Sequence, residues 1–131
     1  MNTLANFEHV GKRAFYRPVG TVTFERAVEM VAESMVLARS LGLADILVNT
    51  NGLSGFPPPS IFARHALALK WAEAAGASLH VALVARPEII DTEKIGVLMA
   101  QNRGVSGDVF TNEVAALAWL DSRTGAFGTI S

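Results

Sequence analysis

The sequence predicts a single α/β domain in which a mixed sheet of four to five strands is covered by about four helices. Two apolar runs, residues 46–48 and 79–85, have the composition of strands that are covered on both faces. Segments with apolar residues at spacings of three and four alternate with these runs, as is typical of helices that pack on a sheet. The chain has 131 residues, half of them apolar, which suits one core. The expected order of elements is β-β-α-β-α-β-α-β-α.

The first forty residues predict a hairpin and then a helix. Residues 7–10 and 13–19 flank a Gly-Lys turn signal and are expected to pair as antiparallel strands. Apolar residues at helical spacing follow. A helix is therefore expected to begin after a cap at Thr21 or Thr23 and to end at Gly42.

The middle of the chain predicts a central strand, a stiff loop and a helix. Residues 46–48 form a short apolar run bounded by turn residues, and they are expected to lie at the centre of the sheet. Three consecutive prolines then hold the loop in an extended conformation. Ser60 is the first good N-cap after them, and Leu67 and Trp71 lie on one apolar stripe of the helix expected to follow. Gly76 is the expected stop.

The last third of the chain repeats the alternation with shorter elements. A helix capped at residue 91 or 92, a minimal strand at residues 108–110 and a final helix capped by Thr111 are expected. The domain is expected to span residues 1–121, and residues 122–131 to form a flexible tail.

Composition argues against several classes of function. The formal net charge is −1 and the Lys and Arg residues are dispersed, so no basic stripe is available for nucleic acid or an anionic membrane. The chain has no cysteine, which rules out disulfides and cysteine metal sites, and a reducing cytoplasm is the default location. No segment approaches the roughly 18 apolar residues of a membrane span, so a soluble protein without stable membrane insertion is expected.

No residue pattern points to a catalytic or a metal site. His9, His65 and His80 share no ligand spacing, so neither a metal nor another cofactor is expected. His80 alternates with apolar neighbours, which predicts a partly buried and hydrogen-bonded imidazole. Ser60 and His65 on one helix are not aimed at each other, and no pair of titratable groups suits acid–base work. The chain is therefore expected not to be an enzyme.

Several short stretches, taken in their order and spacing, cover nearly the whole chain. They are Gly20-Thr21-Val22-Thr23, Ile46-Leu47-Val48-Asn49 with Leu53, Val81-Ala82-Leu83-Val84, Asn102-Arg103-Gly104, Val109-Phe110-Thr111 and Ala116-Leu117-Ala118-Trp119-Leu120. This arrangement resembles the STAS domain family of the anti-sigma-factor antagonist type, and especially its SpoIIAA-like branch. The resemblance implies a single-domain STAS-like fold that acts by docking onto a partner protein.

The resemblance also implies a regulatory position. In phospho-regulated members a partner kinase modifies a serine at the start of the second helix, and Ser60 is the matching position here. This chain has Pro59 where the family has an aspartate, and Asn49 where an acidic residue often ends the central strand. Other members of the branch look like binders of apolar ligands or membrane-associated proteins.

The start of the second predicted helix is also a candidate anion site on physical grounds. A phosphate on Ser60 would meet unpaired backbone N–H groups, with Arg64 and Arg86 within reach. The alternative is that Ser60 only caps the helix, which contributes about 1 kcal/mol.

Two functions of different classes remain open. The first is a non-enzymatic regulatory module that docks onto another protein or, as a homodimer, onto itself. Its docking residues are expected to be Leu53, Phe56, Ser60, Ile61, Phe62, Arg64 and Arg86. The second is a binder of a small apolar or lipid-like ligand in a pocket beside the loop from Leu53 to Ser60, between Phe56 and the helices that carry Trp71 and Met99.

Overall fold

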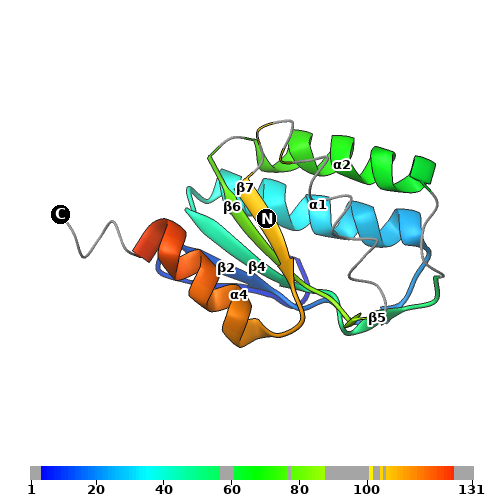
Figure 1. Cartoon of the computed structure of the whole chain (residues 1–131), viewed down its shortest axis with the longest axis horizontal. Coiled ribbons are helices and arrows are strands. Elements are labelled where there is room, and N and C mark those ends of the chain that lie inside the picture. Colours follow the sequence, from blue (N-terminus) through cyan, green and yellow to red (C-terminus); the bar gives the residue numbers. More distant parts are fainter. Residues whose placement is uncertain are drawn as a thin grey trace.

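The computed structural model describes residues 4–56, 61–76, 78–87, 101, 104 and 106–125, and for residues 61–65 and 124–125 it gives the course of the backbone only. This part of the chain folds as an α/β domain with a mixed sheet, as the sequence predicts. Figure 1 shows the sheet between two layers of helices.

The sheet has five strands in the order β1-β2-β4-β6-β7. β1 is antiparallel to β2, whereas the pairs β2–β4, β4–β6 and β6–β7 are parallel. The predicted hairpin and the predicted central strand are therefore confirmed. The strand bounds are β1 (Phe7–Val10), β2 (Arg13–Tyr16), β4 (Asp45–Asn49), β6 (His80–Val84) and β7 (Ser106–Phe110).

Helices cover both faces of this sheet, which explains why the three middle residues of the central strand β4, Ile46 to Val48, are all apolar. α1 (Phe24–Ser40) and α2 (Ile61–Ala75) lie side by side on one face, and α4 (Glu113–Leu120) lies on the other (Figure 1). Successive strand residues point to opposite faces. Ile46 and Val48 therefore join the larger core under α1 and α2, while Leu47 joins the smaller core under α4.

The ends of α1 and α2 follow the predicted capping chemistry. The hydroxyl of Thr23 accepts a hydrogen bond from the backbone N–H of Arg26, so Thr23 is the N-cap of α1. Gly42 and Gly76 follow the two helices with φ of +73° and +63°, the left-handed conformation that ends a helix. Both predicted stops are confirmed.

The N-cap of α4 differs from the prediction by one residue. The side chain of Asn112, and not that of Thr111, accepts a hydrogen bond from the backbone N–H of Ala115, at 2.8 Å. Both residue types serve as N-caps, so the choice between two neighbours depends on the direction in which the chain leaves β7.

Three further features concern the connecting segments. β3 (Gly20–Thr21) and β5 (Leu53–Ser54) pair in parallel as a small second sheet, which the sequence does not predict. α4 continues into one π-helical turn, η1 (Asp121–Gly125), where the sequence predicts the start of a tail. The helix predicted to follow residue 91 or 92 falls on residues outside those described. In the described ranges, no helix is both long and apolar enough to cross a bilayer.

Candidate functional site

The structure describes the side chains of three predicted site residues. Leu53 is fully buried, because β5 places it against the domain, so its assignment to an exposed docking surface is wrong. Phe56 is half-buried and packs edge-on against Phe24 of α1, with 5.8 Å between the ring centroids. Arg86 is half-buried just beyond β6. These three residues do not form one exposed surface.

The remaining predicted docking residues cannot be placed in this way. Ser60 lies outside the described residues, and so do the side chains of Ile61, Phe62 and Arg64. α2 begins at Ile61, directly after Ser60. The cap, anion site and phosphorylation site at Ser60 stay predictions.

Two of the residues predicted to line an apolar ligand pocket, Trp71 and Phe56, are engaged in packing. Trp71 is buried in the larger core, and its indole Nε1–H donates to the backbone carbonyl of Val28 on α1 at 3.4 Å. Phe56 is engaged with Phe24. Met99 lies outside the described residues. Trp71 therefore packs α2 against α1, and Phe56 packs against the first residue of α1.

A polar cluster lies where β2 and β4 end, at the edge of the sheet where α/β folds usually bind ligands. Arg17 donates through Nε and Nη2 to the two carboxylate oxygens of Glu113, at 2.8 and 3.0 Å. Asn49 Nδ2 donates to the same carboxylate at 2.8 Å, and its Oδ1 accepts from the backbone N–H of Asn51. The Arg17 guanidinium also lies 5.1 Å from the ring centroid of Phe15. These groups satisfy one another and fasten α4 to the sheet.

A second cluster lies at the opposite edge, where β2 and β4 begin. Arg13 donates through Nε and Nη2 to both carboxylate oxygens of Asp45, at 2.8 and 3.0 Å, and through Nη1 to Asp121 at 2.8 Å. The Asp45 side chain is only 2% exposed, so this bidentate pair compensates a buried charge. The hydrogen bond that Arg13 donates to Asp45 is the main cause that raises the pKa of Arg13.

Together, Arg13 and Arg17 hold the two ends of α4. Arg13 begins β2 and Arg17 directly follows its last residue, four positions and about 13 Å further on, and in an extended chain this spacing places both side chains on the same face. Their partners Glu113 and Asp121 stand at the first residue and the C-cap of an eight-residue helix about 12 Å long. The near match of the two lengths lets one strand fix both ends of one helix. We refer to these two arginines and the two carboxylates at the ends of α4 as the arginine clamp.

The clamp makes stability depend on pH through Glu113. The hydrogen bond from Arg17 lowers the pKa of Glu113, so this carboxylate stabilises the fold above its unfolded pKa and loses that contribution as pH falls through its folded pKa. Replacing Glu113 with glutamine should cost about 1 kcal/mol at neutral pH, and this gap should shrink as pH falls from about 5 toward 3. Urea unfolding across this pH range measures the gap. A gap that stays constant into acid would contradict the assignment.

One predicted histidine environment is confirmed. His80 begins β6, and its Nδ1 lies 2.7 Å from the hydroxyl of Ser106 on the neighbouring strand β7. The imidazole is half-buried, as its place among apolar neighbours predicts. Among the described residues, no group of three or more His, Asp or Glu side chains is placed to hold a metal ion.

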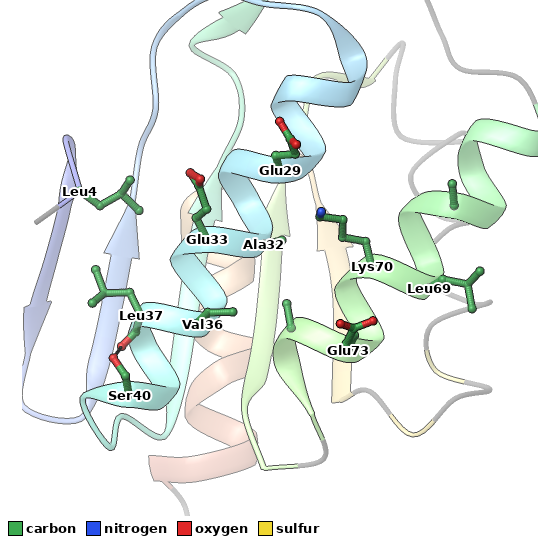
Figure 2. A pocket seen from close by; sticks show the side chains of 12 residues that line it. Leu4, Glu29, Ala32, Glu33, Val36, Leu37, Ser40, Leu69, Lys70 and Glu73 are labelled. Carbon is green, nitrogen blue, oxygen red and sulfur yellow. Dashed lines mark hydrogen bonds between the residues drawn. The ribbon is translucent and has the colours of Figure 1, made fainter. Parts of the chain in front are cut away.

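The outer face of the layer formed by α1 and α2 carries an open groove of about 1020 Å³ (Figure 2). Two exposed apolar side chains line it: Val36 of α1 is 53% exposed, and Leu69 of α2 is 42% exposed. Leu37 also lines it, but extends from the side of α1 that faces away from α2, toward Leu4 (Figure 2). We call this feature the α1–α2 groove.

The sequence signal for this groove is an apolar residue on each helix that lies outside the stripe buried against the sheet. Each helix buries one apolar stripe against the sheet, including Val28, Val31 and Met35 on α1. Val36 and Leu69 lie off these stripes, so two neighbouring helices each carry an apolar residue on the solvent side.

The comparisons with known proteins add no functional assignment. No protein-family model matches the chain, and neither the curated proteins nor the solved structures contain a significant match.

Proposed function

We propose that this chain is a non-enzymatic regulatory module of the STAS type, SpoIIAA-like branch, which acts by docking onto another protein through the α1–α2 groove. The observation that carries the proposal is the pair of exposed apolar residues Val36 and Leu69 on the two walls of one groove. An exposed apolar residue that stands alone needs no explanation, but neighbouring ones around a hollow are typical of an interaction site.

The polar groups at the two sheet edges favour a role without catalysis. General acid–base catalysis needs a titratable group that can reach a substrate. Among the described residues, Glu113 is engaged by Arg17 and Asn49, and Asp45 is engaged by Arg13. Their geometry serves to hold β2, β4 and α4 together.

The proposal keeps the second helix at the centre of the docking surface. α2 begins directly after Ser60, and Leu69 stands about 12 Å further along the same helix. A phosphate on Ser60 would be stabilised by the N-terminal N–H groups of α2 and would place negative charge at one end of the docking helix. Phosphorylation of Ser60 is therefore the proposed means of regulation.

Site-specific crosslinking in the protein's own host tests the docking face. A photo-crosslinking amino acid at position 69 is expected to give one discrete adduct, and the same amino acid at position 114, exposed on α4 at the other face of the sheet, is expected to give none. Val36→Glu should abolish the adduct and change the free energy of unfolding by no more than about 0.5 kcal/mol, since Val36 is exposed. The absence of an adduct at position 69, or equal adducts at both positions, would contradict the proposal.

The same cells supply the measurement for the regulatory step. Intact mass of the purified chain should show a fraction that carries one phosphate, and fragmentation should place it at Ser60. This fraction should be distributed unequally between the free and the crosslinked chains. An unmodified chain in both pools would remove the regulatory step and leave the docking proposal standing.

A further inference from the structure

We infer that the occupant of the α1–α2 groove is an amphipathic helix of a different protein, with Lys or Arg residues beside its apolar stripe. This inference rests on the proposed docking function and adds the secondary structure and the charge of the partner. Two observations carry it: the groove lies between two helices, and carboxylates predominate among its described charged residues.

The walls of the groove favour a helix over an extended strand. A strand binds by pairing with free backbone groups at the edge of a sheet, but the backbone of α1 and α2 is hydrogen-bonded within each helix. Two neighbouring helices instead offer ridges of side chains and a furrow between them, into which a third helix can pack. Val36 of α1 and Leu69 of α2 would contact its apolar stripe.

The charges around the groove favour a basic partner. Glu29 and Glu33 stand on the α1 wall, and Glu73 stands on the α2 wall beside Lys70, which extends toward α1 (Figure 2). Arg26 contacts Glu29 and Glu33 only at 3.6 and 3.5 Å, with all three side chains about half-exposed. Such pairs are weak, so both carboxylates keep the capacity to bind a further cation.

A second arginine near the groove, Arg39, is hydrogen-bonded to the backbone at the end of α2. Arg39, at the end of α1, donates through Nη1 to the backbone carbonyls of Glu73 and Ala74, at 3.3 and 2.9 Å. These carbonyls are at the negative C-terminal end of α2, which the guanidinium offsets. Arg39 therefore does not neutralise Glu29 and Glu33 at the other end of the groove.

The same charges disfavour a second copy of this chain as the occupant. A two-fold symmetric pair brings the same patch of each copy together. Each copy would then present three carboxylates and one ammonium to the same set, and like charges brought together weaken association. A helix from another protein with cations at its flanks avoids this repulsion.

Binding of synthetic peptides to the full chain tests the inference, with fluorescence anisotropy as the readout. The probe is a peptide of about 18 residues, five helical turns, with leucines along one face and lysines on the rest. The comparison peptide has glutamate in place of every lysine. The lysine peptide should bind about tenfold or more tightly than the glutamate peptide, and salt should weaken its binding. Equal binding of both peptides would overturn the inference.

Matched variants locate the binding. Glu33→Gln should weaken the lysine peptide by up to about fivefold, whereas Glu25→Gln, which removes the same charge from α1 outside the groove, should not. Leu69→Ser should weaken it about tenfold, whereas Val114→Ser on α4 should leave it unchanged. If Glu33→Gln behaves like Glu25→Gln, or Leu69→Ser like Val114→Ser, the inference fails.

The two proposals fail separately. A crosslinked adduct at position 69 in cells, combined with no binding of the lysine peptide, would leave the docking function standing and remove the basic helix as its partner. The absence of both would remove both.

Discussion

Replacing Arg13 with methionine should lower the free energy of unfolding by about 3–5 kcal/mol. The variant keeps much of the apolar side chain but leaves the Asp45 carboxylate, 2% exposed, without its bidentate partner. It also releases the contact to Asp121 at the end of α4, which matters less because that carboxylate is 65% exposed. Urea unfolding followed by tryptophan fluorescence measures the loss.

Two further variants show whether the buried charge is the cause. Arg26→Met removes an arginine whose ion pairs are long and exposed, and it should change stability by no more than about 0.5 kcal/mol. The double variant Arg13→Met/Asp45→Leu removes both charges and should recover much of the loss, because a buried pair can often be replaced by apolar side chains. A double variant as unstable as Arg13→Met alone would show that the arginine acts by some other route.

Replacing Leu47 with alanine should cost about 3–5 kcal/mol, the upper part of the range for buried leucines. Leu47 is fully buried at the centre of the sheet, on the face that α4 covers, and it packs in the smaller core with Ala82, Val84, Ala116 and Leu120. This core is small and its alanines cannot shift to fill a cavity. Leu69→Ala is the control, since an exposed helical leucine should cost less than about 1 kcal/mol. A similar loss for both variants, measured by urea unfolding, would contradict this packing.

Local chemistry explains why parts of the fold could be predicted from the sequence. Residues 46–48 are identifiable as a buried central strand because the signal, an apolar run with turn residues on both sides, is contained in the strand itself. Thr23 and Gly42 are likewise identifiable because a cap acts within one helical turn. These features require no knowledge of what lies across the domain.

The features that were missed depend on partners that are distant or on elements too short to show a period. Arg13 bonds Asp121 across 108 positions, and Arg17 bonds Glu113 across 96. The sequence places Leu53 in a docking loop because a two-residue strand has no measurable periodicity, and the pairing of β5 with β3 decides its burial. Contacts between residues that are far apart in the chain decide whether such a side chain faces a neighbour or solvent. The residues next to it in the sequence do not show these contacts.

In the candidate site, too, the feature with a local sequence signal could be predicted and the feature that depends on distant residues could not. The helix that begins after Ser60 could be predicted, because an apolar stripe follows that residue in the sequence. The α1–α2 groove could not, because Val36 and Leu69 become neighbours of one hollow only when two helices are placed side by side. Two apolar residues off the buried stripes are the signal to look for.

The arginine clamp joins residues that are made at different times during synthesis. Glu113 is made 96 positions after Arg17, so the clamp cannot close until α4 has been made. Until then Leu47, Ala82 and Val84 have no helix over them. The nascent chain thus presents an apolar strip on one side of its sheet, the kind of surface that ribosome-associated chaperones recognise, and the arrival of α4 ends that exposure.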